Sequence, residues 1–160
     1  MTSENQGGGG RKPLSPAESA AAFALCRRRL ERAVAASCDP SKAWPARVSA
    51  AIRAALEFAE AEPVAARVLT VHAAYRRLDG ADAFAAMVDR FATRLAEGAP
   101  ATVRPELTAR GVVLRIARQT LLQLELRPGR PATEIVPDLV MFALTPYTGF
   151  AAAQRWAADA

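Results

Sequence analysis

The side chains that could carry catalytic chemistry are few and lie far apart along this chain. The candidates are one histidine, His72, and two cysteines, Cys26 and Cys38. A nucleophile built from Cys26 and His72 would need a carboxylate to orient the histidine, and none stands at a suitable spacing. The sequence also lacks a glycine-rich phosphate loop, a serine-hydrolase motif and the ligand spacing of a zinc site. We therefore expect no enzymatic activity, no bound metal and no cofactor.

Polar residues that interrupt apolar stripes are a better clue to function. His72 and Tyr75 fall on the apolar side of one expected helix, and Arg115 and Gln119 fall between the stripes of another. Such residues can hydrogen-bond one another or the backbone inside a filled core. They can also line a pocket between helices, where a few polar groups converge on an apolar ligand. The first interpretation is favoured for any single residue, whereas the presence of several on neighbouring helices favours a pocket.

The elements that must position these residues are predicted to be helices. Half of the residues are hydrophobic (51%), alanine is abundant, and apolar positions recur at three- and four-residue spacing rather than alternating. We expect an all-α fold of six or seven helices in a domain over residues 14–160, preceded by a polar tail over residues 1–13. The expected helices begin at Ser15, Trp44, Pro63, Ala81 and about Thr108, followed by Ile135 to Leu144 and a short piece from Phe150 to Ala158.

Two local signals fix helix ends with particular clarity. Ser15 stands before Pro16 and three residues before Glu18, which is the pattern of a capped helix start. Pro146 follows the apolar run of the sixth helix, and proline cannot continue a helix without losing a hydrogen bond. We therefore expect the first helix to begin at Ser15 and the sixth to end before Pro146.

The sixth expected helix, Ile135 to Leu144, is apolar on every side apart from Asp138. A helix with apolar groups all around must be covered all around. Ten residues are too few to span a bilayer, which needs about 20. Since a small domain would cover only one side, we expect a second copy of the chain to cover the other.

Charge and cysteine usage limit the partners and the compartment. The net charge of +5 raises nucleic acid as a partner, but the arginines are dispersed along the chain, which favours solvated helix faces over a DNA-binding patch. If Cys26 and Cys38 share a helix, about 18 Å separates them, too far for a disulfide. The first residues lack the apolar core of a secretory signal. We expect a cytoplasmic protein that does not bind membranes.

Two long segments resemble the C-terminal domain of TetR-family transcriptional regulators. DPSKAWPARVSAAIRAALEFAEAEPVAARVLTVHA is similar to the start of that family's effector-binding domain, and LTARGVVLRIARQTLLQLELRPGRPATEIVPDLVMFALTPYTG is similar to its last two helices. The resemblance covers roughly residues 16–149. It implies a TetR-like helical bundle that dimerises through its last two long helices and holds a small hydrophobic effector among the earlier ones.

The resemblance, combined with helix faces, implies two sets of site residues. The residues expected toward the ligand are Phe23, Cys26, Phe58, His72, Tyr75, Met87, Phe91, Arg115 and Gln119. The residues expected in the interface of a homodimer are Val112, Ile116, Thr120, Gln123, Leu124, Leu139, Val140, Phe142, Ala143 and Tyr147.

The chain departs from the family pattern at its start. A TetR regulator carries an N-terminal helix-turn-helix that reads DNA, and residues 1–13 do not resemble one. We therefore expect DNA binding only if a further segment or a partner supplies that unit. The alternatives are a helical homodimer with a filled core and no ligand, and a subunit that pairs with a full-length regulator and modulates it.

Overall fold

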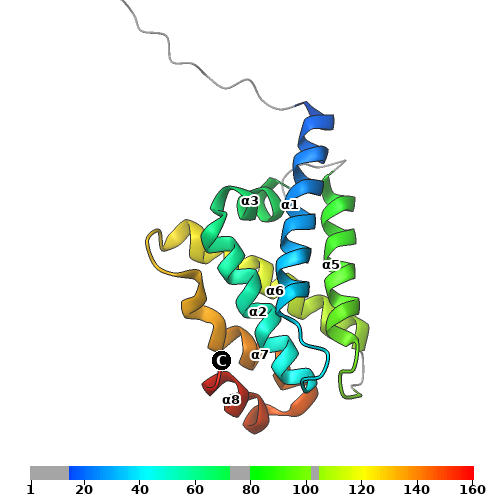
Figure 1. Cartoon of the computed structure of the whole chain (residues 1–160), viewed down its shortest axis with the longest axis vertical. Helices are drawn as coiled ribbons and strands as arrows, with labels where there is room; N and C mark the ends of the chain where they lie inside the picture. Colours follow the sequence, from blue (N-terminus) through cyan, green and yellow to red (C-terminus); the bar gives the residue numbers. More distant parts are fainter. Residues whose placement is uncertain (1–14, 73–79, 102–104) are drawn as a thin grey trace, which may run out of the picture.

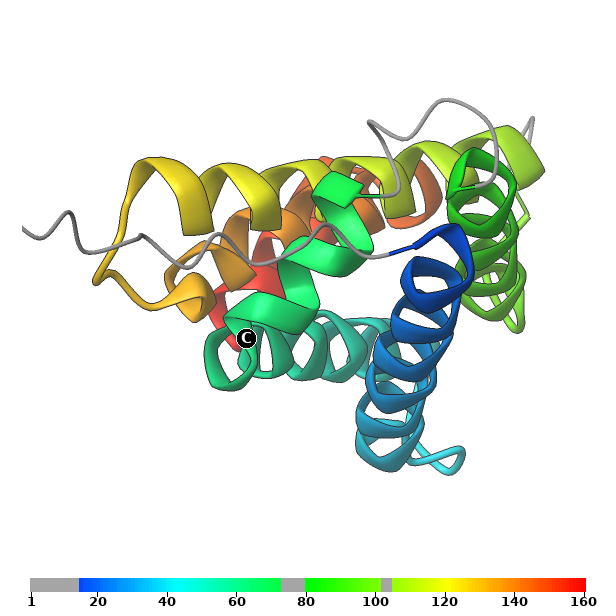
Figure 2. The same cartoon turned by 90° about the horizontal axis from the view of Figure 1, so that it is seen from above.

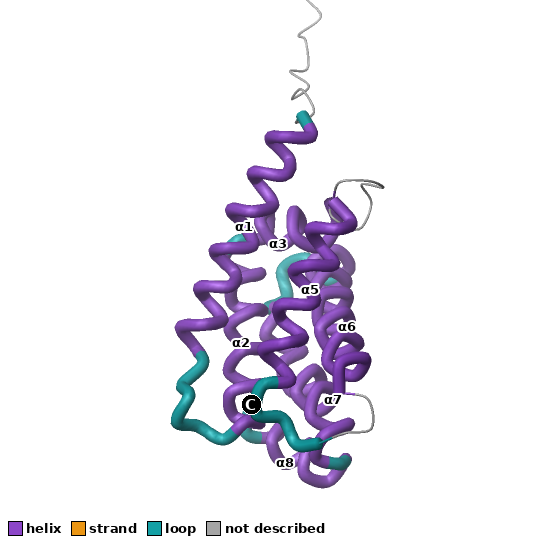
Figure 3. The backbone as a smooth tube through the Cα atoms, turned by 90° about the vertical axis from the view of Figure 1, so that its right-hand side faces the viewer, coloured by secondary structure: helices purple, strands orange, loops and turns teal. Residues whose placement is uncertain are grey.

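The computed structural model describes residues 15–72, 80–101 and 105–160 of the chain. In these ranges the regular elements are helical and no strand occurs (Figure 3). The all-α fold class predicted from the sequence is therefore confirmed. The predicted tail over residues 1–13 and the candidate residue Tyr75 lie outside the described residues.

Seven α-helices and two short turns of other pitch make up the described part of the chain. In order they are α1 (Pro16–Ser37), α2 (Trp44–Ala61), α3 (Pro63–Arg67), the π-helical turn η1 (Val68–His72), α5 (Gly80–Ala96), α6 (Pro105–Leu126), the 3-10 turn η2 (Ala132–Ile135), α7 (Val136–Thr148) and α8 (Phe150–Ala158).

Helix α2 runs through the middle of the domain and packs against α1, η2 and α7 (Figure 1). Helix α5 packs along α6, and α8 folds back against α7. Seen from above, α6 and α2 lie on opposite sides, with α1 and α5 standing at one end (Figure 2). Side chains from these four helices therefore converge on the interior.

The predicted start of α1 is confirmed in atomic detail. The Ser15 hydroxyl accepts a hydrogen bond from the Glu18 amide at 3.2 Å, and the Glu18 carboxylate accepts one from the Ser15 amide at 2.7 Å. This reciprocal pair satisfies two amide donors that a helix start otherwise leaves without partners. Hydrogen bonds from the Ser15 amide and from the Ser15 hydroxyl to the Glu18 carboxyl lower the pKa of that carboxyl from its ordinary value.

The predicted end of the sixth helix is wrong. Helix α7 continues through Pro146 to Thr148 and ends at Gly149, whose φ of +79° lies in the left-handed region. Pro146 stands in the last turn, where its missing N–H removes only one hydrogen bond. Glycine, rather than proline, sets the end of this helix.

The apolar surface of α7 is covered mostly within one chain. Six of its side chains are buried, namely Val136, Leu139, Val140, Ala143, Leu144 and Tyr147. They share an apolar cluster with α2 and with Ala153 and Ala157 of α8. The expectation that one chain could cover only one side of this helix is wrong, because α8 provides cover on a second side. Phe142 alone among the large apolar side chains of α7 is left well exposed, at 39%.

Candidate ligand-binding cavity

An apolar cavity of about 380 Å³ lies between α1, α2, η1, α5 and α6. Small-molecule pockets typically measure about 300–1,000 Å³. Each wall comes from residues at helical spacing, such as Val113, Ile116, Ala117 and Thr120 of α6. The cavity therefore has the size, the apolar lining and the placement between helices that a small-molecule site requires.

The cavity lies between the two apolar clusters of the domain. Val48 and Ile52 belong to the cluster around α7, whereas Phe58, Leu69 and Met87 belong to the cluster around α1 and α5. Alanines stand at several lining positions, including three on the facing walls of α2 and α6: Ala51, Ala55 and Ala117. Their short side chains cannot meet across the interior, so the two clusters leave space between them.

The hydroxyl groups at the lining are already used by the backbone. Thr70 donates to the Ala66 carbonyl at 2.8 Å, and Thr120 donates to the Ile116 carbonyl at 2.9 Å. Both bonds reach back one helical turn, the usual way in which threonine satisfies its hydroxyl inside a helix. Most of the lining is therefore apolar or already satisfied.

Charged groups gather at the end of the cavity where α2 begins and α5 ends. Arg47, Arg94 and Glu97 line this end, together with Trp44 and Cys38. With two arginines and one glutamate, this end of the lining carries a net positive charge. The Arg47 Nη2 donates to the main-chain oxygen of Glu97 at 3.1 Å, while its Nε is buried without a hydrogen-bond partner among the described residues.

Three of the residues predicted to face a ligand line the cavity: Phe58, Met87 and Phe91. Phe23 and Cys26 pack in the adjacent apolar cluster instead, and burial raises the pKa of the Cys26 thiol. The side chain of His72 lies outside the described side chains, and Tyr75 outside the described residues. A ligand-binding role for each of these residues stays a prediction.

Arg115 and Gln119 do not line the cavity. On α6 the lining face carries Ile116 and Thr120, and the residue before each points about 100° away from that face. Arg115 instead lies over the ring of Phe142 on α7, with its guanidinium carbon 5.0 Å from the ring centroid. Its position between two apolar stripes reflects contact with α7 rather than with the cavity.

The sequence interpretation missed Arg47, which is the best candidate in the cavity lining for a polar group that recognises a ligand. One signal was present: Arg47 follows Trp44 by three residues and precedes Ala51 by four, so it stands on the apolar stripe of α2. A charged residue on an apolar stripe suggests a functional role as strongly as His72 does. The stripe was nevertheless assigned to Val48, the next residue, and Arg47 was passed over.

Most residues predicted for a dimer interface are buried inside one chain. This holds for Val112, Thr120, Gln123, Leu139, Val140, Ala143 and Tyr147, whereas Ile116 and Leu124 are half-buried. Gln123, for example, donates to the Pro131 carbonyl at 3.2 Å. Buried within one chain, these side chains offer little surface to a second copy. Of the predicted set, Phe142 remains exposed, and Leu114 of α6 is exposed to a similar degree, at 40%.

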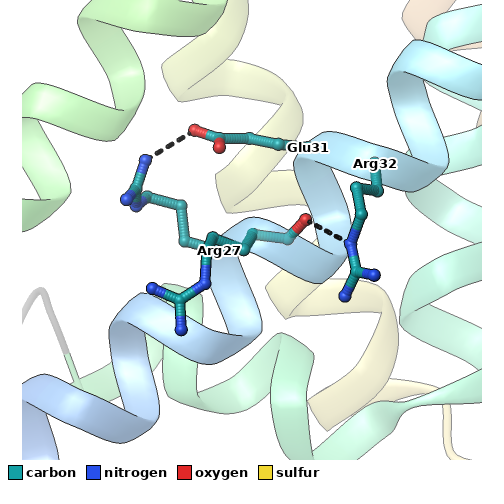
Figure 4. A network of polar contacts seen from close by, with 4 residues as sticks. Arg27, Glu31 and Arg32 are labelled. Atoms are coloured by element: carbon teal, nitrogen blue, oxygen red, sulfur yellow. Dashed lines mark hydrogen bonds and ion pairs between the residues drawn. The ribbon is translucent and has the colours of Figure 1, made fainter.

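Arginines on α1 make ion pairs and backbone contacts within the chain. Arg27 pairs with Glu31 at 2.8 Å, Arg32 donates to the Arg28 carbonyl at 3.4 Å (Figure 4), and Arg29 pairs with Glu62 at 2.6 Å. These contacts give much of the arginine run a structural role. The solvated face expected for the basic residues of this helix stays a prediction, since Arg27 and Glu31 are partly buried.

Within residues 15–72, 80–101 and 105–160, no group of three or more His, Cys, Asp or Glu side chains could hold a metal ion. None of the helices described in these ranges is both long and apolar enough to cross a bilayer. Comparisons of the chain with protein-family models, curated proteins and solved structures gave no match.

Proposed function

We propose that this chain is the effector-binding and dimerisation domain of a TetR-like transcriptional regulator and binds a small hydrophobic molecule. The observation that carries the proposal is the apolar cavity of about 380 Å³ between α1, α2, η1, α5 and α6. The two segments that resemble TetR regulators include α2 and α6, which form two of its walls. Apolar side chains that line such a space gain contacts and lose exposure to water when an apolar molecule fills it.

The cavity also favours this function over a helical interaction protein with a filled core. A filled core would bring the alanines of α2 and α6 against larger partners, whereas Ala55 and Ala117 line open space. The proposal includes no catalytic step. It places the chain in the cytoplasm, where a transcription regulator acts and where Cys26 and Cys38, which are both free thiols, would stay reduced.

Dimerisation through α6 and α7 is the second half of the proposal. The exposed side chains of Leu114 and Phe142 support it, with Arg115 lying over the Phe142 ring beside them. Large apolar side chains on neighbouring helices form the kind of surface that a second copy covers. This surface is smaller than the one predicted from the sequence, because most of α7 is already buried.

Binding of the neutral fluorescent dye N-phenyl-1-naphthylamine tests the ligand-binding half. We expect saturable binding of one dye per chain, with energy transfer from Trp44, which lines the cavity. The variant Ala55→Leu places extra carbon atoms in the cavity and should abolish this binding. Ala86→Leu makes the same change at an exposed position of α5 outside the lining and should leave it intact.

Two outcomes would overturn the ligand-binding half. A dye that fails to bind the wild-type chain would show that the cavity does not admit apolar molecules. A dye that binds Ala55→Leu as tightly as the wild type would lie somewhere else on the protein.

A further inference from the structure

The end of the cavity formed by α2 and α5 holds a guanidinium whose position is fixed but whose donors are only partly used. Arg47 Nη2 donates to the Glu97 carbonyl at the C-terminal end of α5, at 3.1 Å. The last carbonyls of a helix attract a cation through both hydrogen bonding and the helix dipole. This contact holds the side chain in place without consuming its remaining N–H groups.

Gly98 shapes the space that Arg47 occupies. This glycine ends α5 with φ of +77°, and a Cβ at its position would lie 2.7 Å from Arg47 Nη2. The left-handed backbone favours glycine here, and the missing Cβ leaves room for the guanidinium. The hydrogen bond to the Glu97 carbonyl places the guanidinium beside Gly98, and a donor that is already in position costs little ordering entropy on binding.

The Nε–H of Arg47 is buried and has no hydrogen-bond partner among the described residues. A buried donor left without an acceptor costs more free energy than an exposed one, and a charged donor costs most. Arg94 and Glu97, both exposed residues, also line this end of the cavity. The rest of the lining is apolar apart from Cys38 and the two threonines, whose hydroxyls are satisfied.

From this arrangement we infer that the ligand is an apolar molecule with a carboxylate head, which Arg47 binds at the α2–α5 end while the apolar body fills the rest of the cavity. A carboxylate accepts two parallel N–H bonds from one guanidinium, so it matches the spare donors of Arg47 better than a hydroxyl does. The inference rests on the proposed ligand-binding function and specifies the chemistry of its ligand.

Decanoate and 1-decanol test the inference, because they share an apolar chain and differ in the head group. Displacement of N-phenyl-1-naphthylamine from the wild-type chain should give decanoate about tenfold higher affinity than 1-decanol, in line with a charge-assisted pair. In Arg47→Met this preference should vanish while 1-decanol binds within about twofold of its wild-type affinity. Arg47→Lys keeps the charge without the fork and should give an intermediate preference.

Arg118→Gln is the control, since it removes an exposed α6 charge outside the lining and should not change the preference. The ratio of the two affinities within each variant is unaffected by a uniform loss of stability. Equal affinity of the two probes for the wild type, or a preference that survives in Arg47→Met, would overturn the inference while leaving the cavity function standing. Failure of the wild type to bind either probe or the dye would instead overturn the proposed function.

Discussion

The indole nitrogen of Trp44 donates a hydrogen bond to the main-chain oxygen of Leu95, 2.8 Å away, and so joins the first residue of α2 to the last turn of α5. The same indole packs against Tyr147, with ring centroids 4.9 Å apart, and lines the cavity. One side chain therefore connects the helix that runs through the domain, the α7 cluster and the charged end of the candidate site.

Trp44→Phe tests this connection. Phenylalanine keeps an aromatic ring beside Tyr147 but removes the donor to Leu95, so the free energy of unfolding should fall by about 1–2 kcal/mol. Urea denaturation followed by circular dichroism measures the change. Trp156→Phe is the control, because Trp156 is half-buried beside the same cluster. Equal losses in the two variants would mean that ring size, rather than the hydrogen bond, determines the effect.

Gly98→Ala tests whether Arg47 occupies the space above the end of α5. The added Cβ would meet the guanidinium at 2.7 Å and would sit at a φ of +77°. Left-handed backbone costs a non-glycine residue about 1–2 kcal/mol, whereas the flexible end of the Arg47 side chain can move aside at little further cost. Thermal unfolding measures the loss of stability.

Gly129→Ala supplies the matched control, because Gly129 has a φ of +88° but no atom within 4 Å of its added Cβ. It should show the backbone cost alone. The two losses should be similar, and a much larger loss in Gly98→Ala would show that the Arg47 side chain cannot move aside. The variant should also reduce the preference for decanoate, since it moves the same guanidinium.

The start of α1 should respond to pH through Glu18. Its folded-state pKa is lowered from the ordinary 4.5 by its hydrogen bonds to Ser15, so the folded chain favours the carboxylate. The stabilisation is therefore fully present above about pH 4.5 and is lost as the pH falls through the folded-state pKa. Thermal unfolding should show Glu18→Gln less stable than the wild type at pH 7, with the gap closing in acid.

A Ser15→Ala background separates the capping pair from other effects of charge. Without the serine hydroxyl, its hydrogen bond to the Glu18 carboxyl, one of the two that lower the pKa, is gone, and Glu18→Gln should then cost less at neutral pH. An undiminished cost in this background would point to an interaction between Glu18 and the helix dipole alone.

How far the sequence predicts this protein depends on the range of the interactions involved. The Ser15–Glu18 capping pair was predictable because both partners lie within four residues and the rule is local. The end of α7 was not, because the cost of Pro146 is small in a last turn and Gly149 supplies the stop. The cover that α8 gives to α7 is a tertiary contact, and a nine-residue helix shows no signal of where it will pack.

The cavity wall was predicted in part, through Phe58, Met87 and Phe91, since helix faces follow from spacing. The role of Arg47 depends on an approach between α2 and the end of α5, fifty residues apart in the chain.

Tyr147→Phe should leave the chain as stable or stabilise it. The Tyr147 hydroxyl is buried without a hydrogen-bond partner among the described residues, and burial raises its pKa. Removing a buried hydroxyl that has no partner relieves its desolvation cost, so we expect a gain of up to about 1 kcal/mol at pH 7. A loss greater than that would show that the hydroxyl has an acceptor in solution.

The raised pKa of Tyr147 also has a consequence in alkali. The unfolded chain releases this proton near the ordinary pKa of 10.0, before the folded chain does. Ionisation of Tyr147 therefore leaves the stability of the folded chain unchanged below about pH 10. Stability is then lost as the pH rises through the folded-state pKa. Tyr147→Phe should lose less stability than the wild type between pH 9 and pH 11, about one unit on either side of that pKa. Parallel urea titrations across this range measure the difference.

Phe142→Asp combined with Leu114→Asp tests the proposed dimer without disturbing the core. Both side chains are about two-fifths exposed in the single chain, so aspartate at either position stays hydrated. Val140 is unsuitable for the same purpose because it is fully buried, and a buried carboxylate would unfold the domain whatever its assembly. The double variant should sediment as a monomer with unchanged helical circular dichroism, whereas the wild type should sediment as a dimer at micromolar concentration. Arg53→Asp is the control for added negative charge, because Arg53 is exposed on α2, outside α6 and α7, and donates to the Ala160 carbonyl. It should leave the dimer intact.

A wild-type chain that stays monomeric at every concentration would remove this surface from the proposal. A double variant that still dimerises would do the same, because its aspartates would face their symmetry copies and like charges would oppose the contact.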